Sequence, residues 1–355
     1  MARLGDICIK AASNIKQSDL EGNVGKYPIY GASGLIKTVD FYEQEKPYVA
    51  VVKDGAGVGR ILQCPAYSSV IGTLQYILPN EDVDVRYLAY AMTHMNLSKY
   101  YLGAAIPHIY FKDYSKEELL DHSKEEQQHI AAVLDKVSEL IDLRKRQLAK
   151  LDELVKSRFI ELFGDPKHNN NNLVKIGDIG SLTSGGTPSR AKPEYFEGDI
   201  RWYSAGELNS LYLPDSVEHI SEMALQQSSA KLFNKGTLMI GMYDTAAFKM
   251  GILTEDSSSN QACANLNPKQ GFNIVWLYYL FDIMKPIFLQ ERQGVRQKNL
   301  SLSKIKEFEV PFAPFELQEQ FASFVEQTDK SKLTVQQSLD KLETLKKSLM
   351  QEYFG

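Results

Sequence analysis

The sequence predicts an α+β protein with an internal pseudo-twofold repeat: two β-rich lobes at opposite ends of a long antiparallel two-helix coiled coil. Three observations predict this fold. A 40-residue segment occurs twice, each copy carries apolar residues at heptad spacing, and strand-like stretches with glycine-rich turns precede each copy. The 355 residues, 43% of them hydrophobic, are enough for two or three domains with ordinary cores.

The duplication is the strongest signal. Residues 125–164 align with residues 316–355 without a gap, and twelve positions are identical: Glu125, Gln127, Ala131, Leu148, Lys150, Leu151, Leu154, Lys156, Ser157, Glu161, Phe163 and Gly164 in the first copy. The regions in front of the two copies also begin alike, because residues 3–7 (RLGDI) correspond to residues 175–179 (KIGDI). The chain therefore repeats the order lobe, helix, lobe, helix.

Each copy has an apolar seam with alternating steps of four and three, which is typical of helices that pair. One such seam alone is also compatible with a helix that faces a core, but two matched seams are natural partners. Arg144 lies within the first seam, where it either fixes the register or extends its charge to solvent. The predicted seam comprises Ile130, Leu134, Val137, Ile141, Leu148, Leu151, Val335, Leu339, Leu342 and Leu349, and Arg158 and Leu162 continue it in the first helix.

The connections predict how the helices run. An asparagine-rich linker after the first helix is short and of flexible composition, so the second lobe begins near the end of that helix. The second helix then returns antiparallel. The predicted division is a first lobe (1–112), a first spacer helix with its approach segment (113–164), a linker (165–172), a second lobe (173–300) and a second spacer helix with its approach segment (301–355). Within the lobes we expect strands at 48–52, 74–78 and 237–240 and helices at 84–95 and 273–284.

Signatures of catalysis are missing from the sequence. Residues 55–60 (GAGVGR) do not have the spacing of a dinucleotide fingerprint, and no GxxxxGK[ST] phosphate loop occurs. The six histidines include no pair at metal-ligand spacing with a third ligand nearby. We therefore expect no catalytic, cofactor-binding or metal-binding residues. No apolar run is long enough for a membrane span, and three scattered cysteines with no apolar leader predict a cytoplasmic protein.

The remaining chemistry is that of binding. Arg, Lys, Gln and Asn side chains contact base edges, while Ser, Thr and Lys suit phosphates. The candidate DNA-binding residues lie on turns of both lobes: Tyr30, Ser33, Lys37, Lys53, Arg60, His108, Tyr110, Lys112, Thr187, Ser189, Arg190, Lys192, Arg201, Tyr203, Arg292, Arg296, Gln297, Lys298 and Asn299. For any one of them a solvated surface side chain is the ordinary alternative.

The net charge of −5 counts against a protein that grips phosphates unaided. The first lobe has 11 Lys and Arg against 10 Asp and Glu, and the second has 12 against 13. If DNA is the ligand, the cations must be clustered locally or supplied by a partner.

Motifs in both lobes, in a repeated order, resemble those of type I restriction-modification specificity subunits over nearly the whole chain. They are residues 3–7, 26–34 (KYPIYGASG) and 54–60 (DGAGVGR) in the first lobe, and residues 175–179, 184–189 (SGGTPS) and 200–202 (IRW) in the second. Residues 302–305 (LSKI) and 310–315 (VPFAPF) then lead to 318–320 (QEQ).

This resemblance implies two target-recognition domains, each contacting one half of a bipartite site in double-stranded DNA. It implies that the helices act as a ruler and as the docking surface for two methyltransferase subunits, joined by restriction (motor) subunits. S-adenosylmethionine, ATP and Mg²⁺ would then belong to those partners, and none would bind to this chain.

Three hypotheses remain open from the sequence. The leading one is a non-catalytic DNA-recognition subunit that directs partner enzymes. The second is a stand-alone bivalent DNA-binding or regulatory protein, which tight and specific binding by the purified chain alone would favour. The third is an enzyme, a methyltransferase or nuclease with a disguised site, which binding of S-adenosylmethionine by the isolated chain would favour.

Overall fold

The computed structural model describes residues 1–102, 107–169, 172–292, 294 and 299–355, which fall into two compact units. Unit 1 comprises Met1–Arg146 and Val335–Gly355, and unit 2 comprises Gln147–Thr334. Each unit therefore contains one lobe, part of the first long helix and part of the second.

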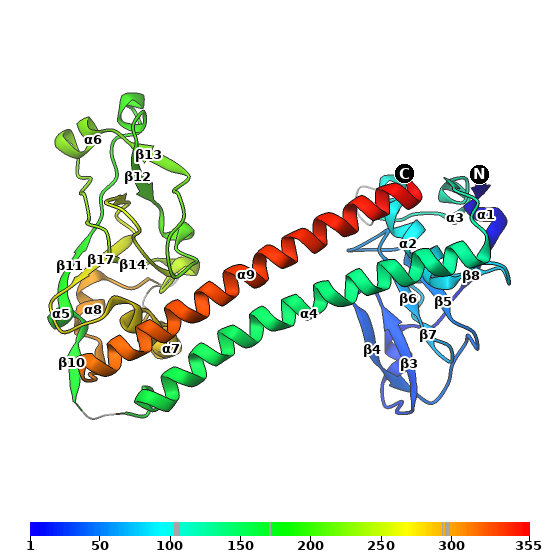
Figure 1. The fold of residues 1–355 in the computed structure, drawn as a ribbon, viewed down its shortest axis with the longest axis horizontal. Helices are drawn as coiled ribbons and strands as arrows, with labels where there is room; N and C mark the ends of the chain where they lie inside the picture. Colours follow the sequence, from blue (N-terminus) through cyan, green and yellow to red (C-terminus); the bar gives the residue numbers. More distant parts are fainter. Residues whose placement is uncertain (103–106, 170–171, 293, 295–298) are drawn as a thin grey trace. The chain divides into compact units, whose positions relative to one another are not determined.

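The lobe of unit 1 is built from three small sheets (Figure 1, blue to cyan). The four-stranded sheet has the order β2 (Cys8–Ala12), β8 (Leu74–Pro79), β5 (Tyr48–Val52), β6 (Ile61–Cys64). The three-stranded sheet has the order β4 (Gly34–Val39), β3 (Tyr27–Gly31), β7 (Ser69–Val70), and β1 (Ala2–Arg3) pairs with β9 (Glu118–Leu119). The helices are α1 (Leu4–Ile7), α2 (Val85–His94) and α3 (Phe111–Tyr114), with 3-10 turns at Gln17–Leu20 and Leu97–Tyr100.

The lobe of unit 2 repeats this plan. Its four-stranded sheet has the order β11 (Gly180–Ser184), β17 (Cys263–Pro268), β14 (Leu238–Gly241), β15 (Met250–Ile252). Its three-stranded sheet has the order β13 (Glu218–Ile220), β12 (Ile200–Tyr203), β16 (Ser258–Ser259), and β10 (Leu173–Lys175) pairs with β18 (Glu309–Pro311). Its helices are α5 (Ile176–Ile179), α6 (Glu222–Gln227), α7 (Ile274–Phe288) and α8 (Leu302–Glu307), with 3-10 turns at Pro193–Phe196, Ala205–Glu207, Asp244–Ala246 and Leu289–Glu291.

The duplication predicted from the sequence is therefore present in the topology. Both lobes combine a four-stranded antiparallel sheet, a three-stranded sheet and a two-strand pair. In both, the outer strand of the three-stranded sheet pairs parallel with the middle strand, β7 with β3 and β16 with β12. Because chance does not reproduce the same mixed pairing twice, the lobes are structural repeats.

The central strand of each four-stranded sheet separates two hydrophobic clusters. All five residues of β5 are buried, with Val49 and Val51 facing one cluster and Ala50 and Val52 the other. The alternation follows from the two-residue period of a strand. In β14, Leu238 and Ile240 likewise face one cluster while Met239 faces another. A continuous apolar run thus marks the middle of each lobe.

The local predictions agree closely with the observed elements. The predicted strand at 48–52 is β5, and those at 74–78 and 237–240 overlap β8 and β14. The predicted helix at 84–95 is α2, which Asp84 caps by accepting from two backbone N–H groups. Helix α7 continues beyond the predicted end at 284, through Pro286 to Phe288. Packing explains the extension, because the Phe288 ring stacks on Phe308 with centroids 4.7 Å apart.

The two long helices are α4 (Lys124–Phe163) and α9 (Phe315–Phe354), one residue from the predicted bounds at each end. In unit 1, Leu349 and Tyr353 of α9 pack on the cluster that contains Ile130 of α4. Nearer the middle of the helices, Arg144 Nε donates to Ser338 Oγ at 3.2 Å. The α9 residue number falls as the α4 number rises, so the two segments are antiparallel.

The same direction holds in unit 2. There Lys332 pairs with Asp152 at 2.7 Å, and the Phe159 and Phe321 rings are 5.2 Å apart. Arg144 therefore faces a hydroxyl of α9 in unit 1, and Lys332 faces a carboxylate of α4 in unit 2. Among the residues that the structure describes, no helix is both long and apolar enough to cross a membrane.

Most of the predicted seam is buried or half-buried. Ile130, Leu134, Val137, Ile141, Val335 and Leu339 are buried, and Leu148, Leu151, Leu342 and Leu349 are half-buried. The end of the first seam differs from the prediction, because Phe159 is fully buried and Arg158 is half-buried over the Phe324 ring. There α4 packs on the lobe of unit 2 as well as on α9, so its buried face follows the 3.6-residue helical period instead of the heptad.

A buried glutamine joins each long helix to its lobe. Gln127 Oε1 accepts from the backbone N–H of Asp84, the residue that caps α2, and its Nε2 donates to the His122 carbonyl. In unit 2, Gln318 Oε1 accepts from the N–H of Asn273, the cap of α7, and its Nε2 donates to the Ala313 carbonyl at 2.7 Å. These glutamines occupy the same position of the repeat.

The three cysteines are free and buried, and burial raises the pKa of each thiol to about 12. Since the thiolate is the reactive form, we expect Cys8, Cys64 and Cys263 to react with Ellman's reagent at pH 8 at least tenfold more slowly in the native protein than in urea. Stopped-flow absorbance measures both rates. Rapid reaction of all three thiols without denaturant would contradict the burial.

Candidate nucleic-acid interface

Three loops of the first lobe meet at one end of the four-stranded sheet. They are the turn after β3, the β5–β6 loop and the segment before α3. Arg60 Nη1 donates to the Ala32 carbonyl at 2.8 Å, and Gly55 N donates to the Pro107 carbonyl at 3.0 Å. A cavity of about 450 Å³ is lined by Ser33 and Asp54 between the first two loops. Sequence-predicted residues from separate segments are thus brought onto one surface.

The segment before α3 carries the aromatic and cationic side chains of this surface. His108 Nδ1 is hydrogen bonded to an Asp54 carboxylate oxygen, and the His108 ring lies 4.2 Å from the exposed Tyr110 ring. The Lys112 ammonium lies over the Tyr110 ring, 5.2 Å from the ring centroid. An exposed ring with a cation above it can stack on a base or contact a phosphate.

The other predicted residues of the first lobe contribute less directly. Lys37 Nζ donates to the Leu20 carbonyl at 3.0 Å, which holds the β3–β4 hairpin to the preceding 3-10 turn. Tyr30 is half-buried in β3, and burial raises the pKa of its hydroxyl. Lys53 is half-buried at the start of the β5–β6 loop.

The second lobe has the same three loops. Lys249, the residue before β15, donates through Nζ to the Gly206 carbonyl at 3.5 Å. Arg60, the residue before β6, makes the equivalent contact in the first lobe, where it donates to the Ala32 carbonyl in the turn after β3. Leu300 N donates to the Met242 carbonyl at 2.8 Å, as Ile109 N does to the Lys53 carbonyl at 3.0 Å. Lys249 was not among the sequence candidates. The repeat could have indicated it, because it precedes its strand as Arg60 does.

The arginine and lysine predicted on the turn after β11 are exposed but contact neighbouring side chains of the second lobe. Arg190 forms a bidentate pair with Glu218, and its guanidinium lies 4.3 Å from the Phe196 ring centroid. The hydrogen bonds with Glu218 raise the pKa of Arg190 and lower the pKa of the Glu218 carboxyl. Lys192 Nζ donates to the Tyr195 hydroxyl at 2.9 Å. Ser189 is exposed, and Thr187 donates to the Gln261 side chain.

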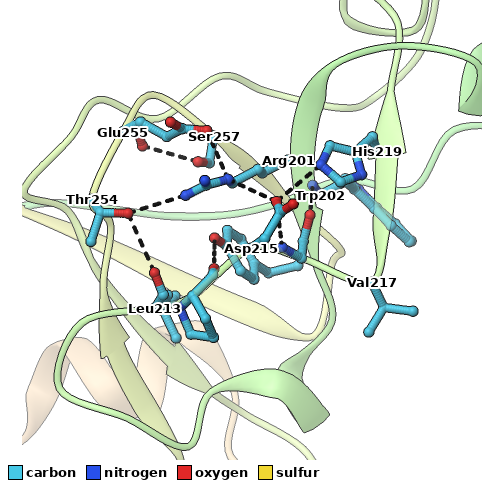
Figure 2. Close-up of polar contacts among 12 residues, drawn as sticks. Arg201, Trp202, Leu213, Asp215, Val217, His219, Thr254, Glu255 and Ser257 are labelled. Carbon is cyan, nitrogen blue, oxygen red and sulfur yellow. Dashed lines mark hydrogen bonds and ion pairs between the residues drawn. The ribbon is translucent and has the colours of Figure 1, made fainter. Parts of the chain in front are cut away.

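Arg201 is held by carboxylates. Figure 2 shows its guanidinium between Asp215, at 2.9 Å from Nε, and Glu255, at 2.7 Å, while Nη1 donates to Thr254 Oγ1 at 3.1 Å. His219 Nε2 also lies 3.0 Å from Asp215. A phosphate would have to compete with two carboxylates that are already in place, so this arginine is less available than an exposed, unpaired one.

Tyr203 lies in the interior, with 1% of its surface exposed, and its hydroxyl donates to the Pro214 carbonyl at 2.6 Å. Its residue type, in the run 201–204, made it a candidate, and the segment IRWY has no alternation of polar and apolar residues that would indicate its burial. Arg292 Nε donates to the Leu289 carbonyl at 3.0 Å, and Asn299 Oδ1 accepts from the Asp244 N–H at 3.1 Å. Arg296, Gln297 and Lys298 lie outside the described residues.

No group of three or more His, Cys, Asp or Glu side chains in the described ranges is placed to hold a metal ion. Each lobe offers a loop surface with hydrogen-bonding and cationic side chains, and in the first lobe the exposed Tyr110 ring is part of it.

Comparison with known proteins places this arrangement in a family. The model of the type I restriction modification DNA specificity domain matches residues 1–153 and 169–344, one copy for each repeat. The chain belongs to this family. Its membership accounts for the order lobe, helix, lobe, helix that the sequence and the topology both display.

Relatives of the specificity domain family agree with this assignment. The MjaIX type I restriction enzyme specificity subunit of Methanocaldococcus jannaschii is 30% identical over 162 residues, 44% of this chain and 37% of the relative. The EcoR124I/EcoR124II specificity subunit of Escherichia coli is 23% identical over 43% of this chain and 40% of the relative. These two matches thus span about two fifths of each relative. A putative type I specificity subunit of Mycoplasma pneumoniae is 24% identical over 340 residues, 90% of this chain and 86% of the relative.

Two solved structures share the fold over nearly the whole chain. The type I restriction-modification S subunit from M. genitalium has a TM-score of 0.66 at 15% identity, covering 100% of this chain and 95% of that one. A chain from a structural study of complex assembly in a type I restriction-modification system has a TM-score of 0.59 at 15% identity, covering 99% and 96%. The mixed α and β fold with two tandem specificity domains is therefore that of the family.

Proposed function

We propose that this chain is the sequence-specific DNA-binding specificity subunit of a type I restriction-modification complex, and that it makes and breaks no covalent bond itself. The observation that carries the proposal is the loop surface that occurs in both specificity domains. A protein with two such surfaces can contact two half-sites in one duplex. The relatives whose names are given above are specificity subunits, which supports the same function here.

The proposed DNA-contacting residues follow from their placement. In the first lobe they centre on Ser33, Arg60, His108, Tyr110 and Lys112, with Tyr30, Lys37 and Lys53 behind them. In the second lobe they centre on Lys249 and Asn299, which lie on the equivalent loops. The other proposed residues of this lobe are Thr187, Ser189, Arg190, Lys192, Arg201, Arg292, Arg296, Gln297 and Lys298. The buried Tyr203 is left out. Residues 1–112 and 173–300 form the proposed recognition domains, and the segments 113–164 and 301–355 form the proposed spacer.

The partners are proposed to be two methyltransferase subunits, together with restriction subunits. The near-neutral lobes support this, because a partner that clamps the duplex would supply positive charge that this chain lacks. The identical repeat positions Leu154 and Leu345 are both exposed, by 48% and 46%, as two copies of one partner would require. S-adenosylmethionine, ATP and Mg²⁺ are then ligands of the partners, and the complex acts in the cytoplasm.

The experiment that tests the function removes one matched heptad from each long helix, residues 141–147 of α4 and 335–341 of α9. Seven helical residues span about 10 Å, or roughly three base pairs of B-DNA. We expect the two half-sites to stay the same while the spacer between them shortens by about three base pairs. Mapping methylated sites in the genome of such a strain gives both quantities.

The control replaces the same two segments by foreign heptads with the same apolar pattern, which should keep the spacer. An unchanged spacer after the deletion would contradict the ruler. Tight, specific binding by the purified chain without partners would instead support a stand-alone DNA-binding protein, and binding of S-adenosylmethionine by that chain would support an enzyme.

A further inference from the structure

His108 and Asn299 occupy the same place in the two lobes. His108 directly precedes Ile109, whose backbone N–H donates to the Lys53 carbonyl at the start of the β5–β6 loop. Asn299 directly precedes Leu300, whose backbone N–H donates to the Met242 carbonyl at the start of the β14–β15 loop. Each also contacts an aspartate of that loop, Asp54 or Asp244. The repeat therefore puts two different side chains into one structural position, at the loop surface proposed to face DNA.

The contact with Asp54 fixes how His108 presents itself. A carboxylate only accepts hydrogen bonds, so the proton of a neutral His108 ring resides on Nδ1, and Nε2 is left as an acceptor. Among the described residues none provides a partner for Nε2, and this atom does not belong to their buried side-chain atoms without a partner, so it is open to solvent. The neutral ring of His108 thus offers an exposed acceptor.

Asn299 presents the opposite character. Its Oδ1 accepts from the backbone N–H of Asp244 at 3.1 Å, which fixes the orientation of the amide. Its Nδ2 has no partner in the part of the chain that the structure describes, and it is not enclosed either. Asn299 thus offers an outward donor.

We propose that His108 and Asn299 are specificity-determining residues of opposite hydrogen-bond character, one in each half-site. His108 accepts from an exocyclic amino group in the major groove, the N6 of adenine or the N4 of cytosine. Asn299 donates to a base that presents an acceptor at its place, such as O6 or N7 of guanine or O4 of thymine. This inference rests on the proposed function, and it assigns Asp54 as the positioning residue of His108.

The surroundings of His108 support a direct contact with a base. The exposed Tyr110 ring lies beside it and provides a stacking surface, and the exposed Lys112 ammonium lies over that ring. The acidic partner would be unfavourable at a phosphate, because Asp54 adds negative charge to the same site. An uncharged base edge is the better match.

The test uses the complete complex, captured from its native host through a tag on this chain, and selects bound DNA from a randomised duplex library. We expect His108→Leu to reduce the preference for adenine or cytosine over guanine or thymine at one position of one half-site roughly tenfold. Asn299→Leu should relax one position of the other half-site and leave the first unchanged. Asp54→Asn should relax the same position as His108→Leu, since an amide no longer fixes the proton of His108.

Two further variants separate base contact from structural damage. His108→Asn can donate to Asp54 through its amide and present an oxygen acceptor, so it should retain more of the preference than His108→Leu. Asp82→Asn removes the same charge from an exposed site elsewhere in the lobe and should change nothing. If His108→Leu does not yield a soluble complex, Asp54→Asn decides the matter.

The outcomes distinguish the two proposals. A wild-type complex that selects a bipartite site while the His108, Asp54 and Asn299 variants select the same bases would overturn this inference and leave the proposed function standing. A wild-type complex that enriches no site would overturn the proposed function.

Discussion

Phe321→Ala is expected to lower the free energy of unfolding of unit 2 by about 3–5 kcal/mol, the usual cost of truncating a fully buried phenylalanine. Phe321 is completely buried near the start of α9. Its ring meets Phe159 at 5.2 Å, Phe163 at 5.9 Å and Tyr279 at 5.4 Å, so it joins both long helices to the lobe helix α7. The truncation would leave a cavity where these three elements meet.

The measurement takes advantage of the tryptophans. Both of them, Trp202 and Trp276, lie in unit 2, so the change in tryptophan fluorescence in urea follows the unfolding of this unit alone. Phe315→Ala is the matched control, since Phe315 lies on the same helix but is 40% exposed. The prediction is wrong if the two substitutions shift the fluorescence transition equally.

Leu154→Glu together with Leu345→Glu is expected to abolish assembly with the proposed methyltransferase subunits, while the chain itself stays folded. The two leucines occupy the same repeat position, one on each long helix, and neither is part of the buried seam. A carboxylate buried in an apolar interface without a partner costs far more than the lost leucine contact. Each single substitution should therefore remove one partner subunit and the double substitution both.

The stoichiometry of complexes purified from the host, measured by light scattering, gives the result directly. Loss of methylation at the target sites should accompany loss of the second subunit. Leu333→Glu is the control, because Leu333 is exposed on α9 but its counterpart in the repeat is Asp142, so it belongs to no duplicated surface. A double variant that still carries two methyltransferase subunits would exclude these leucines from the interface.

The helices and the repeat were predictable because their signals are local and occur twice. Forty residues of heptad spacing indicated α4 and α9 to within one residue. The division of each lobe into sheets of four, three and two strands was not predictable, because strands that pair lie far apart in the sequence, as Trp202 and Ser258 do in β12 and β16. Strand pairing over such distances depends on the whole core and not on any single segment.

The candidate interface was predicted in part for the same reason. The residue types were recognisable, so His108, Arg60 and Asn299 were found. The acidic partners were not, since Glu218 reaches Arg190 across 28 positions and Asp54 reaches His108 across 54. Gln127 and Gln318 were visible as an identity between the repeats, but their burial could not be inferred from a polar side chain at a helix start.

The buried glutamines have a consequence for how such proteins diversify. Gln318 contacts its lobe through the backbone N–H of Asn273 and backbone carbonyls at 271 and 313, and Gln127 does the same at Asp84 and His122. Main-chain groups are present whatever the side chains are. A lobe of unrelated sequence could therefore replace the present one and keep the same contact with the long helix. The only requirement is that one of its helices begins where α2 or α7 begins, so that a backbone N–H meets the glutamine. Under the proposed function, such an exchange would give a new DNA specificity on an unchanged scaffold.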